Sequence, residues 1–235
     1  MCDAKTMKIK IYVLVIALLQ MFLHISMHAQ PMKTYTIDFP KHVFRFGIPM
    51  EIAKGIWPTD IDQKFDPFDA AYLRDGFRRI GSSLYDFKGP FWKDAYGSLK
   101  INFIVQKRSP KFQSEIVTLD GLDRYIRWWT QDVNPSYPFN FGRAVCGNST
   151  WLSRAHSNFS MPNSTETGQR EELEVFSIPI DGDMFLDVGF IITEWEPGSA
   201  NKWRLKAEKL REAIKSTMVL ETKSSPDSEN PHGAR

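Results

Sequence analysis

The chain has 235 residues, of which 42% are hydrophobic, 25% charged and 13% aromatic. This composition excludes a disordered, collagenous or coiled-coil protein and fits one globular domain. Three lysines and one aspartate lie in an N-terminal segment that has the pattern of a removable leader. Removing them from the totals of 30 cations and 28 anions leaves 27 of each. The neutral remainder gives no reason to expect a nucleic-acid partner or an anionic membrane surface.

Residues 1–29 have the three-part pattern of a secretory signal peptide. Lys8 and Lys10 precede an apolar run at 11–23, and a small residue lies just before Gln30. The run is broken by polar residues and is shorter than the roughly 20 residues that span a bilayer, so an uncleaved anchor helix is the less favoured alternative. The sequence therefore predicts an exported protein, periplasmic or secreted, without stable membrane insertion after signal removal.

Cysteine use and glycosylation sequons add little to this prediction. Cys146 is the single cysteine after residue 29, so an intrachain disulfide is excluded in the predicted mature chain. The sequons at Asn148, Asn158 and Asn163 become modified only in a host that glycosylates secreted chains. Whether they are used is left open.

Residues 30–220 predict a single globular α+β domain, because this length suits one hydrophobic core and no long linker or internal repeat interrupts it. Residues 221–235 contain no large apolar side chain. Such a segment buries too little apolar surface to offset the entropy of ordering, so a disordered tail is predicted.

The clearest local pattern is a β-hairpin at 173–192. Asp181-Gly182 separates two β-rich runs, and tight hairpin turns favour this pair because they need positive φ. Alternation places Leu186 and Val188 on one face, and Asp183 and Asp187 on the other face, which we expect to be exposed to solvent. The two carboxylates lie roughly 13 Å apart along the strand, too far for a paired glycosidase acid and base.

Two amphipathic helices are predicted from periodic apolar residues. One begins at Ser199 or Asn201, and another runs from Asp120 or Leu122 to Thr130. The apolar stripe of the first consists of Trp203, Ala207, Leu210, Ile214 and Met218. The stripe of the second consists of Leu122, Tyr125, Ile126 and Trp129.

Weaker patterns mark the remaining elements. Residues 99–105 alternate as a strand, and 35–39 with 42–46 suggest a short N-terminal hairpin. A short helix is predicted at 69–80, and another strand within 143–154.

This order of elements resembles the PsbP-like α/β/α sandwich, an antiparallel sheet with helices on both faces. The segment Phe44-Arg-Phe-Gly-Ile-Pro49 is similar to the opening of those proteins, and residues 203–216 to their closing helix. The resemblance spans most of residues 34–219. It implies a non-catalytic binding or accessory protein of the bacterial envelope, a group that includes immunity proteins against toxins delivered by type VI secretion.

Residues able to carry catalysis or bind a metal are sparse. His42, His156 and His232 are the only histidines after residue 29 and have no recognisable ligand spacing, so no zinc site is expected. Cys146 and His156 would lie about 33 Å apart if one strand carried both, so an inert buried thiol is favoured. The sequence also has no phosphate-binding loop, dinucleotide-binding turn or nucleophile elbow. We therefore expect no enzymatic activity and no cofactor.

An acidic cluster at 60–69 offers the carboxylate oxygens that a calcium loop needs, because hard cations prefer oxygen ligands. Lys64 and Phe65 stand where a calcium-binding loop of the EF-hand type needs an acidic or amide residue and a glycine. A polar surface loop is the favoured interpretation.

Aromatic residues in predicted loops are the best candidates for a partner-binding surface. They are Phe91, Trp92, Tyr137, Phe139 and Phe141, with Trp128 on the predicted middle helix. Prolines beside them restrict the backbone, and aromatic rings offer large contact areas. The equal alternative is that these rings cover the edge of the sheet.

The leading hypothesis is a non-catalytic exported binding protein, most concretely a periplasmic immunity or inhibitor protein that neutralises a toxin. A carrier of an apolar ligand and a hydrolase with unrecognised chemistry remain as alternatives. A carrier should have an internal apolar cavity, an enzyme should have a cleft that joins titratable groups, and a binder should have neither.

Overall fold

The computed structural model describes residues 31–50, 76–88, 95–133, 138–157, 170–195 and 202–223. The chain falls into two compact units, Met1–Met32 and Lys33–Arg235, and the elements below belong to the second, apart from Met32. Several predicted features lie outside the described residues: the signal peptide, the acidic cluster at 60–69, Phe91, Trp92, Tyr137 and residues 224–235.

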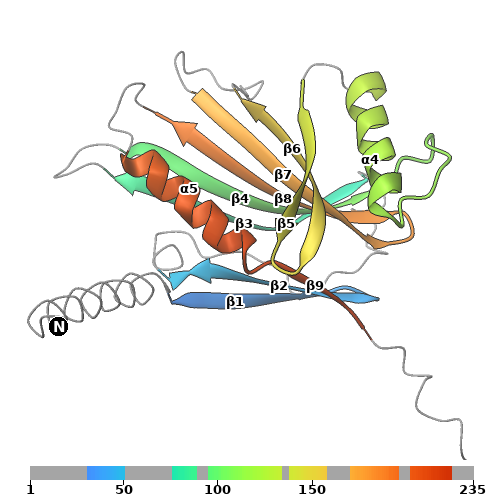
Figure 1. The fold of residues 1–235 in the computed structure, drawn as a ribbon, viewed down its shortest axis with the longest axis horizontal. Coiled ribbons are helices and arrows are strands. Elements are labelled where there is room, and N and C mark those ends of the chain that lie inside the picture. The colour runs from blue at the N-terminus through green and yellow to red at the C-terminus, as the bar shows by residue number, and fades with distance from the viewer. Residues whose placement is uncertain are drawn as a thin grey trace, which may run out of the picture. The chain divides into compact units, whose positions relative to one another are not determined.

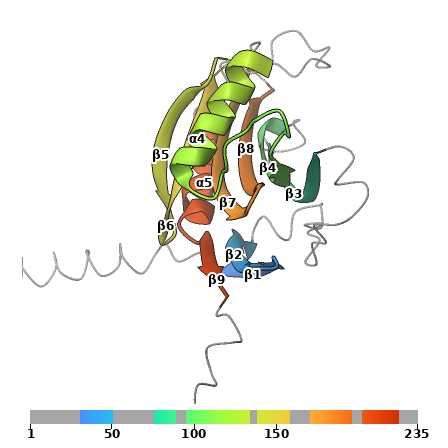
Figure 2. The same ribbon diagram turned by 90° about the vertical axis from the view of Figure 1, so that its right-hand side faces the viewer.

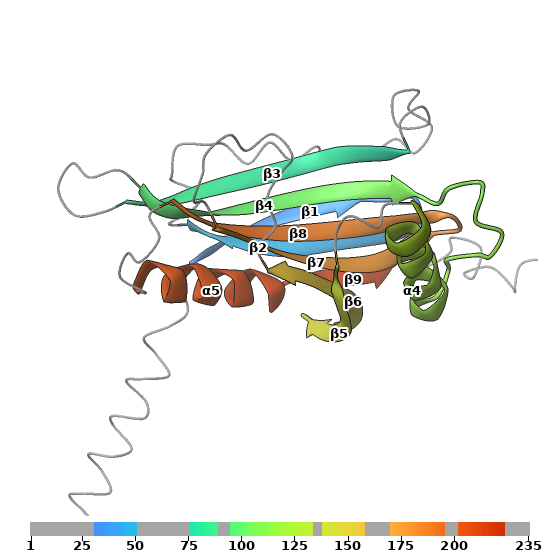
Figure 3. The same ribbon diagram turned by 90° about the horizontal axis from the view of Figure 1, so that it is seen from above.

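The main layer is a six-stranded antiparallel sheet with the order β3-β4-β8-β7-β6-β5. Its strands are β3 (Phe77–Lys88), β4 (Ala95–Lys107), β5 (Asn140–Cys146), β6 (Ser149–Ser157), β7 (Arg170–Asp181) and β8 (Met184–Glu194). β3 and β5 form its two edges (Figure 3). The predicted strand at 99–105 is confirmed within β4.

Two predictions about this sheet need correction. The proposed single strand within 143–154 is the pair β5 and β6, joined by a turn in which Gly147 has a φ of +55°. The helix predicted at 69–80 is wrong for residues 77–80, which begin β3 and pair with β4. The four residues Phe77-Arg-Arg-Ile80 are too few to distinguish the helical period from the strand period, and pairing with β4 decides the outcome.

The predicted β7–β8 hairpin is confirmed, with Gly182 in its turn at a φ of +24°. Leu186 and Val188 are fully buried, as the alternation predicts. The prediction that Asp187 faces solvent is wrong, because this residue is only 3% exposed. Its face of the sheet is also covered, and its carboxylate is paired there.

A second, three-stranded sheet has the order β1-β2-β9. Its strands are β1 (Met32–Asp38), β2 (His42–Pro49) and β9 (Val219–Thr222), and β1 and β2 are neighbours as predicted. The domain boundary predicted at 220 is too early, because β9 continues through Glu221 and Thr222 in antiparallel pairing with β2. Backbone hydrogen bonds and the 2.5 Å ion pair between Arg45 and Glu221 order a segment that lacks large apolar residues.

Helix α5 (Lys202–Lys215) packs on one side of the six-stranded sheet against β4 and β8, and also contacts β2 (Figure 1). The predicted stripe is confirmed for Trp203, Ala207, Leu210 and Ile214, which are buried. Its last predicted member, Met218, is also buried but lies beyond the end of the helix. Gly97 in β4 admits this packing: a Cβ there would lie 2.4 Å from the Trp203 ring.

Helix α4 (Leu119–Trp128) lies over β6 and β7 (Figure 2). Thr118 caps it, because its side chain accepts a hydrogen bond from the Gly121 amide at 3.1 Å. Leu122, Tyr125 and Ile126 are buried as predicted, but Trp129 is 39% exposed. Trp129 begins the π-helical turn η1 (Trp129–Val133), whose wider turn carries it away from the apolar stripe.

The two sides of the six-stranded sheet are therefore distinct. The side that we call the core face carries Phe103, Trp151, Phe176, Leu186 and Val188, and is covered by α5 and the three-stranded sheet. The other side, the α4 face, carries Gln106, Leu152, Arg154, Ser177, Phe185 and Asp187. The domain belongs to the α+β class, with an antiparallel sheet between helices. No helix within the described part of the chain has the length and apolar character needed to cross a bilayer.

Candidate functional site

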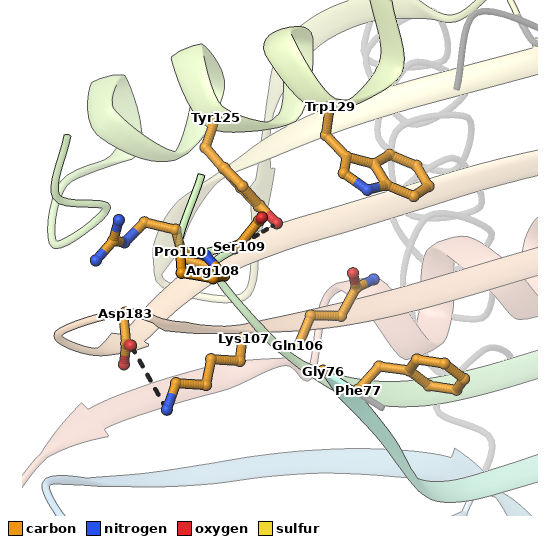
Figure 4. Close-up of a pocket in the computed structure, with 10 residues that line it drawn as sticks. All are labelled: Gly76, Phe77, Gln106, Lys107, Arg108, Ser109, Pro110, Tyr125, Trp129 and Asp183. Atoms are coloured by element: carbon orange, nitrogen blue, oxygen red, sulfur yellow. Dashed lines mark hydrogen bonds and ion pairs between the residues drawn. The ribbon is translucent and has the colours of Figure 1, made fainter. Parts of the chain in front are cut away.

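A cleft of about 840 Å³ lies on the α4 face, where β4 ends beside α4 (Figure 4). The start of β3 and the end of β4 form one side, with Phe77 and Gln106. Tyr125 of α4 and Trp129 of η1 form the other, and Asp183 lies at the turn before β8. Elements from four parts of the chain thus meet at one site.

Two aromatic rings form the rim of this cleft. Phe77 is 56% exposed and Trp129 is 39% exposed, so both present apolar surface to solvent. In the view of Figure 4, the side chain of Gln106 lies between the two rings. Exposed aromatic rings beside a concave surface are a common feature of binding sites.

Hydrogen-bond donors line the interior. The Tyr125 hydroxyl accepts a hydrogen bond from the Ser109 amide at 3.1 Å, and burial raises the pKa of Tyr125, so the hydroxyl keeps its proton. No acceptor for that proton is found among the described residues. The same holds for the indole N–H of Trp129 within the part of the chain that the structure describes.

A buried polar network lies beneath the cleft, centred on Asp187. Its carboxylate receives hydrogen bonds from Arg154 at 2.5 Å, Gln106 at 2.6 Å and Ser177 at 2.5 Å. Arg154 and Asp187 cancel each other's charge, and their side chains are 12% and 4% exposed. The network orients the Gln106 amide, because one of its two N–H groups donates to Asp187.

The described residues that line the cleft carry a net positive charge. Lys107 and Asp183 form a loose ion pair at 3.8 Å. The Arg108 guanidinium donates to the Phe112 carbonyl oxygen, and no carboxylate of the described chain pairs with it. Since Arg154 and Asp187 are mutually neutralised, two cations and one anion remain among the described residues that line the cleft.

Three of the aromatic residues predicted from sequence are described, and none lines this cleft. Trp128 is half-buried against Phe112, with ring centroids 5.4 Å apart. Phe139 and Phe141 lie together, 6.3 Å apart, and the Arg127 guanidinium stacks 4.4 Å from the Phe141 ring. These rings thus cover the region around α4 and the start of β5.

The cleft residues Phe77 and Trp129 were missed as binding candidates for identifiable reasons. Trp129 completed a regular apolar stripe, and the π-helical turn that exposes it leaves no clear sequence pattern. Phe77 lay within a segment interpreted as a helix. Neighbouring Trp128 and Trp129 did indicate that both rings need not enter the core.

The Cys146 and His156 pair has no catalytic geometry. Cys146 points to the core face at the end of β5, whereas His156 of β6 belongs to the α4 face. The supposition that one strand carries both residues is therefore wrong. Burial raises the pKa of the Cys146 thiol to about 11, which supports the prediction of an inert cysteine. Within the described ranges, no three His, Cys, Asp or Glu residues are grouped to hold a metal ion.

The chain was compared with family models, curated proteins and solved structures. No family model matches the chain, and no curated protein matches it. A solved structure of LpqN, described as involved in cell envelope biogenesis of Mycobacterium tuberculosis, is similar at a TM-score of 0.39 and 9% sequence identity. The alignment covers 80% of this chain and 91% of LpqN.

Proposed function

We propose that this chain is a non-catalytic exported binding protein that contacts a protein partner at the rim of the cleft. The observation that carries the proposal is the pair of exposed rings, Phe77 and Trp129, on two sides of a concave surface with unused donors. Exposed aromatic side chains contribute large contact area and are enriched among the residues that dominate binding energy.

The more specific form of the proposal is a periplasmic immunity or inhibitor protein that neutralises a toxin. Its support is the signal-peptide pattern at 1–29 and the resemblance to PsbP-like proteins. An antiparallel sheet with α5 and α4 on opposite sides agrees with the arrangement expected for a PsbP-like sandwich.

The cleft also supports the alternative that this protein is a hydrolase. By the criterion given above, a cleft that joins titratable groups is expected of an enzyme, and Lys107, Arg108, Tyr125 and Asp183 share one. The groups are nevertheless poorly placed for acid–base chemistry: Asp183 is paired with Lys107 and Tyr125 retains its proton. We therefore propose binding ahead of catalysis.

The experiment starts with recovery of a partner on the exported protein and measurement of its affinity. Phe77→Ala and Trp129→Ala should weaken binding by about 1 to 4 kcal/mol at whichever ring is a hot spot, with thermal unfolding nearly unchanged. Leu205→Ala is the matched control, because this residue is 55% exposed on α5, away from the cleft lining. Wild-type affinity in both ring variants would contradict the proposed surface.

The aromatic residues predicted from sequence enter the same test. Ala substitutions of Trp92, Tyr137 and Phe139 should weaken partner binding without loss of stability if they extend the contact surface. A parallel loss of stability and affinity would show that these rings cover the core instead. Loss of function in Asp187→Asn or Tyr125→Phe, with folding and partner affinity preserved, would favour the hydrolase.

A further inference from the structure

We infer that the cleft accepts an acidic side chain, Asp or Glu, carried on a loop of the protein partner. This inference rests on the proposed protein-binding function and specifies the chemistry of the partner. The carboxylate would accept hydrogen bonds from the Tyr125 hydroxyl and the Trp129 indole N–H, in a field made positive by neighbouring cations.

The hydrogen-bond inventory is the first support. One of the two N–H groups of the Gln106 side chain donates to Asp187, and the Ser109 backbone N–H donates to Tyr125. The Tyr125 hydroxyl proton and the Trp129 N–H remain without acceptors in the described residues. A carboxylate offers only acceptors, so it complements this pair of donors, whereas an ammonium or guanidinium would offer donors to donors.

Charge is the second support. Arg79 lies two residues beyond Phe77 on the same face of β3, is exposed, and forms no ion pair with any described residue. Among the described residues, Arg79 and the lining residues Lys107 and Arg108 make three cations, against the lining anion Asp183. Such a field attracts an acidic group and repels a basic one.

The open rim favours a loop over a free metabolite. A small carboxylate in the interior would leave Phe77 and Trp129, 56% and 39% exposed, in contact with water. Residues that flank an acidic side chain on a loop would cover both rings and exclude water from the charged contact. The same arrangement strengthens the hydrogen bonds by lowering the local dielectric constant.

The test uses a displayed library of disulfide-closed random loops, selected on the exported chain at low ionic strength. Enriched loops should share an Asp or Glu, and the Glu→Gln or Asp→Asn form of a loop should bind at least about 10-fold more weakly. Tyr125→Phe and Trp129→Phe remove one donor each while keeping the ring, and each should also weaken binding about 10-fold. Affinity for the acidic loop should fall as salt is raised.

Matched variants separate this inference from the proposed function. Loops without an acidic residue that still require Phe77 and Trp129 would overturn the inference and leave the binding surface intact. If the affinity of the enriched loops is unchanged by Phe77→Ala and by Trp129→Ala, the proposed binding surface itself is wrong. If Tyr125→Phe fails to fold, Lys107→Gln with Arg79→Gln is measured instead, and an unchanged affinity and salt dependence would overturn the inference.

Two other occupants are distinguished in the same assay. Free N-acetylglutamate that competes at the same concentration as the loop would make the occupant a small carboxylate. Self-association of the wild-type chain that Trp129→Ala abolishes would make it a second copy of this protein. Either result overturns the assignment to a partner loop.

Discussion

The two faces of the six-stranded sheet are built by the same strands but have opposite chemistry. On the core face, Phe103 stacks on Phe46 of the three-stranded sheet with ring centroids 4.3 Å apart, and Val188 is fully buried. On the α4 face, Asp187 is buried in a polar network beside an open cleft. Because side chains alternate along a strand, one face can stabilise the fold while the other carries the site.

The energetic consequences also differ. Apolar burial on the core face stabilises roughly in proportion to the area removed from water. A buried ion pair gains little net stability over apolar residues of similar size, but loss of one partner leaves an uncompensated charge. The core face should therefore respond to lost volume, and the α4 face to lost charge balance.

The largest effect is expected from Asp187→Ala on the α4 face. Removal of the carboxylate leaves Arg154 buried without a counter-charge, which should lower the free energy of unfolding by about 3 to 5 kcal/mol. Chemical denaturation measures the loss. The double variant Asp187→Leu with Arg154→Met should recover most of it, and failure to recover would mean that the network has a larger structural role than charge balance.

Leu210→Ala and Ile214→Ala test the core face. These side chains are 3% and 0% exposed, so each truncation should cost about 2 to 5 kcal/mol through lost burial and a cavity. Leu205→Ala on the same helix is the control, because this residue is 55% exposed and its loss should stay below about 0.5 kcal/mol. Equal effects at Leu205 and Leu210 would show that α5 presents a different face.

The Cys146 thiol gives the core face a pH dependence. Its pKa is raised from 9.0 to about 11 in the folded chain, so between these values the unfolded chain loses its proton first. Stability should then fall as pH rises from 9 to 11, by at most about 2.7 kcal/mol from this group. Unfolding measured across that range in wild type and Cys146→Ala should differ in slope, and parallel curves would contradict a buried thiol.

Gly97→Ala should have a smaller but measurable effect. The added Cβ would meet the Trp203 ring at 2.4 Å and the Thr193 carbonyl oxygen at 2.5 Å. Overpacking of this kind costs about 1 to 3 kcal/mol. Gly189→Ala is the control on a neighbouring strand, because its nearest contact would be Val175 at an ordinary 3.9 Å. A stable Gly97→Ala protein would show that α5 is free to shift on the core face.

The candidate site was less predictable than the fold. Its angle on the helix predicts Trp128 as a contact residue, whereas Trp129, one residue on, lines the cleft. Asp187 was expected in solvent because an aspartate in a strand usually faces water. Its partners Arg154 and Ser177 come from two other strands, and no local pattern indicates that pairing.

Local sequence was sufficient for the elements whose signals are short-range. The Asp-Gly turn and its alternating strands, and the apolar stripe of α5, follow from backbone sterics and from the periods of two and 3.6 residues. Tertiary structure alone decided the rest: the order of strands from β3 to β5, the pairing of β9 with β2, and the meeting of Phe77, Tyr125 and Trp129 at one cleft. These depend on contacts between residues far apart in the chain, where pairing and burial override local propensity.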